Sequence, residues 1–197
     1  GAPGANLSID GEVRLTGTRE LAAFPGFRFG RHDAFFPTRV ASLPPGISTD
    51  ARGHAVLQAV PPEAEDIDRP LSLEAVVRLR EGSGRPVERL ATTEVPAGVP
   101  LLGLRPLFDG VVAEGGEAGF EVIALDPAGR RTEATVAWVL ERVETRYQWY
   151  EAYGSWSWEP ITTRARIASG EASIGAGAPE RISAPVDWGR YELRVET

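Results

Sequence analysis

The sequence predicts an all-β protein made of two tandem antiparallel β-sandwich domains of the immunoglobulin or fibronectin type. Apolar and polar residues alternate in short runs from one end of the chain to the other, and Gly, Pro and Asp separate these runs. Apolar residues at helical spacing are almost absent. A chain of 197 residues can form two domains of about 100 residues, each with its own core.

The boundary between the two domains is predicted from composition and from a proline-containing spacer. All seven Phe lie at or before Phe120, whereas all nine Trp and Tyr lie at or after Trp138. Residues 96–100 place two prolines around a glycine where the strand patterns stop. We therefore predict one domain over residues 1–97 and a second over residues 98–197.

In the first domain, period-two alternation predicts five strands. One of them covers residues 54–60, with the alternate residues Ala55, Leu57 and Ala59 on one face. A Gly-containing loop at residues 81–85 joins the last two strands as a hairpin. The predicted strands are residues 6–16, 35–43, 54–60, 71–80 and 86–94.

In the second domain, the pattern predicts seven strands. Residues 126–129 between two of them form a type I turn, with Pro in the second position and Gly in the fourth. Seven strands in about 100 residues are typical of a two-sheet sandwich. The predicted strands are residues 101–108, 117–125, 135–150, 155–167, 170–174, 178–183 and 190–196. The expected core residues are Phe120, Val122, Val136, Trp138, Leu140 and Tyr191.

The apolar residues of the strand at 135–150 change face along its length. They occupy even positions up to Leu140 and odd positions from Val143. A β-bulge near Glu141 and Arg142, or passage of the strand out of the core onto a second surface, would explain the change. We expect the base of the resulting hairpin to lie in the sandwich and its tip to project beyond it.

This aromatic β-hairpin covers about residues 143–163 and holds six of the nine Trp and Tyr residues. We place a four-residue connection at residues 151–154. Because side chains alternate faces along a strand, four rings then share one face. On that face, Trp149 pairs with Trp156 and Tyr147 pairs with Trp158.

The opposite face of the predicted hairpin pairs Tyr150 with Ser155 and Arg146 with Glu159. Cross-strand aromatic pairs contribute about 0.2 to 1 kcal/mol each, which fixes register but does not hold a lone hairpin. Two interpretations of the rings remain open at this point. They are either the apolar surface of a hairpin lying on its own domain, or a surface for interdomain or partner contact formed by Tyr147, Trp149, Trp156 and Trp158.

Charge and composition exclude several functions. The net charge is −7, with 21 Arg against 28 acidic residues, so nucleic acid is not an expected partner. The absence of Cys excludes disulfides, thiol nucleophiles and thiolate metal sites in this chain. No apolar run reaches the roughly 20 residues of a membrane span, so we expect no direct membrane contact. The absence of Met predicts a processed or excised piece of a longer product.

No motif in the chain predicts catalysis, a cofactor or a metal. His32 and His54 stand apart, with no further metal-ligating residues at suitable spacing. The acidic residues 63–68 lack the ligand spacing of a calcium loop, and we expect a solvated loop there. Residues 113–117 form a hairpin-type turn whose acids would repel phosphate. We therefore predict a non-enzymatic chain without catalytic, cofactor-binding or metal-binding residues.

An aromatic loop is predicted at residues 24–30, FPGFRFG, where three Phe surround a Pro-Gly turn. A compact loop of this kind can pack with its own rings against the first domain. The alternative is a docking surface for a neighbouring domain.

Four stretches of the sequence together resemble the bacterial alpha-2-macroglobulin family. The run RYQWY at residues 146–150, followed by DWGRY at residues 187–191, is the more specific part of the resemblance. The resemblance covers most of the chain and corresponds to tandem macroglobulin-like domains just upstream of the family's bait region. The four stretches are residues 24–30, 104–131, 143–161 and 185–195.

The resemblance implies a non-catalytic scaffold in a broad-spectrum protease inhibitor that traps proteases after they cleave its bait segment. Its expected partners are neighbouring domains of the same large chain and the target proteases. Its expected location is the periplasm, with a lipid anchor of the parent outside these residues. The family's thioester residues have no counterpart here, because the chain has no Cys. Two alternatives are a carbohydrate-binding sandwich that uses the hairpin rings, and the stalk of an adhesin.

Overall fold

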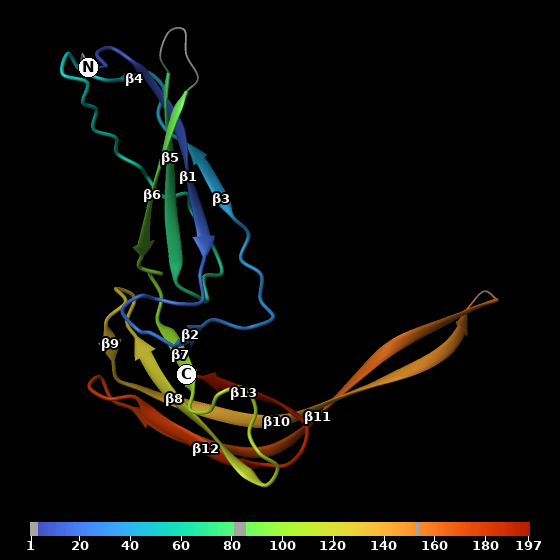
Figure 1. The fold of residues 1–197 in the computed structure, drawn as a ribbon. Coiled ribbons are helices and arrows are strands. Elements are labelled where there is room, and N and C mark those ends of the chain that lie inside the picture. The colour runs from blue at the N-terminus through green and yellow to red at the C-terminus, as the bar shows by residue number, and fades with distance from the viewer. Residues whose placement is uncertain (1–3, 81–85, 153) are drawn as a thin grey trace. The chain divides into compact units, whose positions relative to one another are not determined.

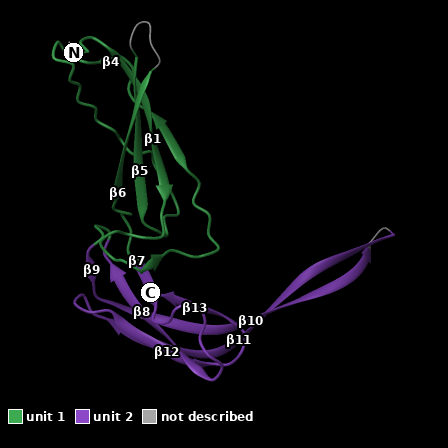
Figure 2. Cartoon of the chain, in the orientation of Figure 1, with its two compact units in different colours: residues 1–101, 127–129 green, residues 102–126, 130–197 purple. Residues whose placement is uncertain are grey.

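The computed structural model describes residues 4–80, 86–152 and 154–197, so the predicted loop at 81–85 lies outside the described residues. The described residues contain thirteen β-strands and no helix, and the strand pairs described below are antiparallel (Figure 1). The chain divides into two compact units, and each is described by itself (Figure 2). The predicted all-β class of antiparallel sandwich domains is confirmed. Unit 1 is Gly1–Leu101 with Pro127–Gly129, and unit 2 is Leu102–Asp126 with Arg130–Thr197.

The sheet of unit 1 has the strand order β3-β1-β5-β6, with the short strand β4 paired to β1. The long strands β1, β5 and β6 match the predicted strands, and β1 and β5 show clear period-two alternation. Strands of two residues are too short to leave a periodic signal, and the sequence did not predict them. The strands of this part of the chain are β1 (Ser8–Gly17), β2 (Arg28–Phe29), β3 (Arg39–Ser42), β4 (Ile47–Ser48), β5 (Leu71–Arg80) and β6 (Val87–Val95).

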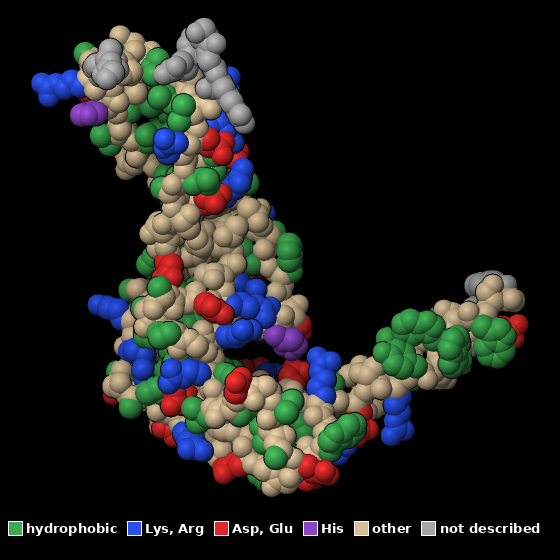
Figure 3. Space-filling view, viewed as in Figure 1, with side chains coloured by type: hydrophobic (Ala, Val, Ile, Leu, Met, Phe, Trp, Pro, Cys, Tyr) green, Lys and Arg blue, Asp and Glu red, His purple; other side chains and the backbone are tan. Residues whose placement is uncertain are grey.

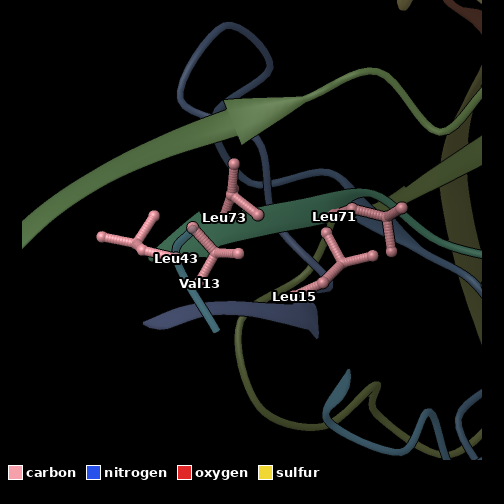
Figure 4. Close-up of a cluster of buried hydrophobic side chains, with 5 residues drawn as sticks. All are labelled: Val13, Leu15, Leu43, Leu71 and Leu73. Carbon is pink, nitrogen blue, oxygen red and sulfur yellow. The ribbon is translucent and has the colours of Figure 1, made fainter. Parts of the chain in front are cut away.

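The two faces of this sheet differ in chemistry. On one face, five buried side chains from β1, β5 and the residue after β3 form an apolar cluster (Figure 4). On the other face, ion pairs join neighbouring strands: Arg14 of β1 lies 3.3 Å from Glu74 of β5. Opposite charges on adjacent strands help to fix the register of the sheet on that face. The buried cluster consists of Val13, Leu15, Leu43, Leu71 and Leu73.

An extended segment without strand pairing covers the apolar cluster, so the prediction of a strand at 54–60 is wrong. The predicted alternation itself is present, because Leu57 and Ala59 pack on the cluster while Val56 is 97% exposed. No sheet partner joins residues 54–60 within the described chain. Alternation of apolar and polar residues therefore indicates an extended backbone that lies on an apolar surface. It does not show whether that backbone is hydrogen-bonded to a neighbouring strand. The predicted strand at 35–43 also shortens to β3, and Phe36 packs on the cluster instead.

The side chain of Arg69 is buried and holds the chain that precedes β3. It donates to both carboxylate oxygens of Asp68, from Nε at 2.7 Å and from Nη2 at 3.0 Å, and Nη2 also donates to the carbonyl of Ala34 at 3.0 Å. A Cβ at Gly30 would lie 2.9 Å from the Arg69 Cβ, and Gly30 has a φ of +75°. Glycine is therefore required there both for space and for backbone conformation.

We predict that Asp68→Asn lowers the stability of unit 1 at neutral pH but not in acid. The hydrogen bond from Arg69 lowers the pKa of Asp68 in the folded chain, with a further contribution from the Arg31 amide, while burial opposes it. Because the folded-state pKa is the lower one, this contribution is complete above the unfolded pKa of about 3.9 and is lost as pH falls through the folded pKa. Thermal unfolding should show the largest difference in Tm near pH 6, a difference that shrinks as pH falls below about 4, and convergence once pH is below the folded pKa. A constant difference across that range would contradict the assignment.

Unit 2 is built from two packed sheets. One has the order β11-β10-β13, and in the other β12, β8 and β7 follow one another, with β9 paired to β8. The segments predicted as separate strands at 155–167 and 170–174 form the single strand β11, so that division was wrong. The strands are β7 (Leu101–Pro106), β8 (Gly116–Leu125), β9 (Arg131–Thr132), β10 (Ala134–Ala152), β11 (Ser155–Ile174), β12 (Glu180–Val186) and β13 (Arg190–Glu196).

Two apolar clusters lie in unit 2, and Trp138 of β10 packs against both. Of the predicted core, Val122, Val136 and Leu140 are buried, while Phe120, Trp138 and Tyr191 are half-buried. Gly170 is the cross-strand partner of Trp138. A Cβ at Gly170 would lie 3.0 Å from the indole nitrogen, so the Trp138 ring occupies the space that the glycine leaves open.

The register of β10 against β11 shifts between Leu140 and Glu141, at the predicted position. Leu140 pairs with Ala168 and Glu141 with Arg166, which makes Ile167 of β11 the extra residue. The bulge thus lies in the partner strand, and β10 keeps its alternation. The odd-numbered apolar residues beyond Leu140 therefore lie on the face of the sheet that points away from the core.

We predict that Trp138→Ala destabilises unit 2 by about 3 kcal/mol, because it removes a ring that joins both clusters and uncovers Gly170. Urea unfolding followed by circular dichroism measures the change. Trp188→Ala is the matched control, since Trp188 is 77% exposed, and a surface substitution of this kind changes stability by less than about 0.5 kcal/mol. Equal effects of the two substitutions would show that Trp138 has no special packing role.

Candidate interaction surface

Strands β10 and β11 continue past the end of β13 as a two-stranded arm (Figure 1). The last residue pair between β10 and β13 joins Val143 to Arg190. We define the arm as residues 144–152 of β10 and 155–163 of β11, which pair with each other along their whole length. The predicted hairpin is present, with its base in the sheet beside β13 and its tip projecting beyond that sheet.

The predicted register of the hairpin is wrong by two residues. Trp149 lies opposite Trp158, not Trp156, and pairing continues to Ala152 opposite Ser155. Two residues assigned to the connection thus belong to β10, and Gly154, with a φ of +76°, suits a tighter turn. Tyr153 lies outside the described residues. Because the error is an even number, the set of residues on each face is unchanged.

The pairs predicted on the opposite face change with the register. Tyr150 lies opposite Ser157 instead of Ser155, and Arg146 lies opposite Ile161 instead of Glu159. The Arg146 guanidinium instead lies 3.6 Å from the carboxylate of Glu144. The predicted cross-strand ion pair is therefore replaced by a pair within β10.

The four predicted site residues, Tyr147, Trp149, Trp156 and Trp158, share one face of the arm, which we call the aromatic face. The rings of Tyr147 and Trp158 meet edge to face, with centroids 5.2 Å apart. Since Tyr147 lies directly opposite Pro160, this is a diagonal contact between the strands. Edge-to-face pairs of this kind contribute about 0.5–1.5 kcal/mol beyond their buried area.

The aromatic face is exposed. Tyr147 and Trp149 are each 64% exposed, Trp156 is 70% exposed and Trp158 is 54% exposed. Figure 3 shows hydrophobic side chains gathered along the arm. The four rings do not form part of the buried core of unit 2.

A network of four charged side chains lies at the base of the arm, on the same side of the sheet as the aromatic face. Arg194 lies 3.1 Å from Glu141 and 3.5 Å from Glu192, and Arg164 lies 3.3 Å from Glu192. The sequence did not predict this network, because its members are separated by up to 53 residues and only the sheet brings them together.

The residues considered for chemistry do not assemble into a site. His32 and His54 are exposed, and the described residues contain no group of three or more metal-ligating side chains. In the acidic stretch, Glu63, Glu65 and Asp66 are exposed while Asp68 is held by Arg69. Residues 113–117 contain the predicted turn, in which the Gly116 amide donates to the Ala113 carbonyl at 2.9 Å.

The aromatic loop at residues 24–30 has two buried rings. Phe29 is fully buried and Phe27 is 5% exposed, while Phe24 meets Phe29 edge to face with centroids 6.4 Å apart. A turn closes the loop, because the Phe27 amide donates to the Phe24 carbonyl at 3.2 Å. The loop is thus packed in part by its own rings, as the first interpretation expected.

One exposed ring was not among the predicted site residues. Trp188 precedes β13 by two residues and is 77% exposed, in a turn where the Asp187 amide donates to the Tyr191 hydroxyl at 3.0 Å. The available signal was its place in the motif DWGRY at residues 187–191, which is one of the more specific parts of the family resemblance. Among the described residues, no helix has the length and apolar character needed to cross a membrane.

Comparison with family models assigns both units to one class of domain. Residues 1–96 match the bacterial alpha-2-macroglobulin MG5 domain, and residues 103–197 match bacterial macroglobulin domain 6. The class that the fold and these matches define is therefore a pair of bacterial macroglobulin domains. The chain belongs to the bacterial alpha-2-macroglobulin family.

Relatives match over the whole chain. The alpha-2-macroglobulin of Escherichia coli K12 is 26% identical over 100% of this chain, which spans 13% of the relative's length. The native conformation of the E. coli protein, solved by cryo-EM, covers 100% of this chain and 13% of the solved chain, with a TM-score of 0.66 at 25% identity. The same protein activated by porcine elastase has a TM-score of 0.64 at 24% identity, over 100% of this chain and 18% of that one.

We predict that replacing residues 150–155 by a two-residue turn leaves unit 2 folded. Neither buried cluster of unit 2 loses a member, because no residue of either cluster lies within residues 150–155. The midpoint of urea unfolding, followed by tryptophan fluorescence, should change little, because all five Trp residues are retained. A loss of cooperative unfolding would show that the tip is part of the core.

Proposed function

We propose that this chain is a non-catalytic scaffold within a bacterial protease inhibitor that traps proteases after they cleave its bait region. The observation that carries this proposal is the match of two consecutive macroglobulin domains along nearly the entire chain. The chain spans about an eighth of the length of its E. coli relative, so trapping would belong to the full-length protein. The proposed location is the periplasm.

The architecture of each unit suits a scaffold. Unit 2 holds two sheets together through apolar clusters, and unit 1 fixes its sheet with cross-strand ion pairs and the buried Arg69. Close-packed cores of this type have low compressibility and transmit strain, which suits a scaffold. The solved structure of the E. coli relative activated by porcine elastase supports a protease as the triggering partner.

The alternatives have less support. A carbohydrate-binding module or an adhesin stalk would explain an exposed aromatic face or a tandem array, but neither explains matches to two successive domains of one family. We propose no catalytic residue, cofactor or metal in these domains. The neighbouring domains of the parent and its target proteases are the proposed partners.

The test uses the full-length parent protein with elastase or trypsin. We expect cleavage outside residues 1–197, followed by a complex in which the protease still hydrolyses a small peptide substrate but no longer digests a large protein. Folded β-sheets resist proteolysis, so residues 1–197 should remain uncut. First cleavage within these residues, or full digestion of large substrates by the treated protease, would contradict the proposal.

A further inference from the structure

The arm exposes more apolar surface to water than is usual for a two-stranded ribbon on its own. All described residues from 145 to 151 and from 154 to 167 are exposed, and they include five Trp and Tyr rings. An isolated two-stranded ribbon is marginally stable in water, and three or more strands are usually needed for independent stability. Contiguous exposed apolar surface of this kind marks an interaction site.

Each strand of the arm has one open edge, and the edge of β10 is the one that continues an occupied strand position of the sheet. Strand β10 is central in its sheet up to Val143, where it pairs with β11 on one side and β13 on the other. From residue 144 to 152 its second side has no strand partner within the described chain. This side is an open edge of nine residues, and the amides and carbonyls of alternate residues point outward and can pair with another extended segment.

The open edge continues the line of β13. A strand laid antiparallel to residues 144–152 would occupy the place in the sheet that β13 occupies beside residues 137–143. Arg190 is the first residue of β13 and pairs with Val143, where the open edge begins. Trp188 precedes Arg190 by two residues and is therefore near the start of this edge. Addition of a strand would convert the ribbon into a three-stranded sheet.

The charge of the arm indicates the chemistry of that strand. The arm carries Glu144, Glu151 and Glu159 against Arg146 alone, which is three negative charges against one positive charge. Glu151 lies on the aromatic face, opposite Trp156, and has no ion-pair partner in the described part of the chain. A basic side chain there would pair with Glu151 and lie against the indole, an arrangement that favours cations.

We propose that the arm binds an extended, basic segment of the full-length polypeptide by β-strand addition along residues 144–152. The segment carries apolar side chains at alternate positions against the aromatic face and a Lys or Arg near Glu151. Its origin in the parent chain rests on the proposed function. A second copy of the arm is a poorer occupant, because it would bring a like-charged surface against this one.

Hydrogen exchange in the full-length protein tests whether the edge is covered. We expect the amides of residues 145–151 that point to the open edge to exchange slowly, as in an internal strand, and Trp149→Ala to accelerate their exchange about tenfold or more. Tyr150→Ala is the matched control, because Tyr150 lies on the opposite face and is also exposed. Rapid exchange of these amides in the unmodified protein would overturn the proposal, as would equal effects of the two substitutions.

Two isosteric substitutions test the charge. Glu151→Gln should accelerate exchange of the arm amides several-fold, and the effect should shrink in high salt. Glu159→Gln removes the same charge from the other face and should have no effect. Equal responses to the two substitutions would exclude a specific basic contact on the aromatic face.

Photo-crosslinking identifies the occupant. A benzophenone amino acid in place of Thr145, an exposed residue on the open edge, should form crosslinks within one full-length chain, to a segment outside residues 1–197. Crosslinks between two chains, or the absence of any crosslink to polypeptide, would overturn the proposal.

An assay of protease trapping distinguishes a failure of the strand-addition proposal from a failure of the proposed scaffold function. Trapping with an uncovered arm would overturn only the strand addition, whereas a covered arm without trapping would overturn only the proposed function.

Discussion

The structure of unit 2 depends on the uninterrupted alternation of β10. Even-numbered side chains of this strand, from Val136 to Leu140, enter the clusters between the two sheets, and odd-numbered side chains face away from them. The bulge at Ile167 in β11 absorbs the irregularity of the pair, so β10 crosses from the sandwich into the arm without changing face. As a result, Tyr147 and Trp149 lie on the same outer face as Glu141. One strand thus supplies the core of the domain and its candidate interaction surface.

Unit 1 covers the apolar face of its sheet in a different way from unit 2. Its sheet has an apolar face, but the layer over that face is an extended segment around Leu57 and Ala59 that makes no ladder. Such a layer has few hydrogen bonds to fix it, so other contacts must hold the neighbouring chain in place. The buried Arg69 supplies one of them by binding Asp68 and the carbonyl of Ala34. Breaking a buried pair of this kind by removing one partner leaves an uncompensated charge, which makes the arrangement costly to lose.

The aromatic face and the charge network at its base give the two functional proposals a common physical basis. Scaffold domains of a large inhibitor need defined contacts with their neighbours, and exposed rings beside an open strand edge provide both affinity and register. Main-chain pairing alone would accept many extended segments. The rings and Glu151 restrict the choice, because alternate side chains must suit an apolar surface and one must carry a positive charge.

The sequence by itself determined the all-β class, most strand positions, the resemblance to macroglobulin domains and the membership of the aromatic face. Alternation is local, so strands such as β5 and β13 could be placed from their own residues. The tertiary structure alone decided the pairing. The hairpin register, the union of 155–167 with 170–174 and the unpaired state of 54–60 depend on which backbones meet, and a period-two pattern is identical for any register that differs by two residues. The network of Glu141, Glu192, Arg164 and Arg194, and the exposure of the rings, likewise follow only from where β13 ends beside β10, a position set by contacts between residues far apart in the chain.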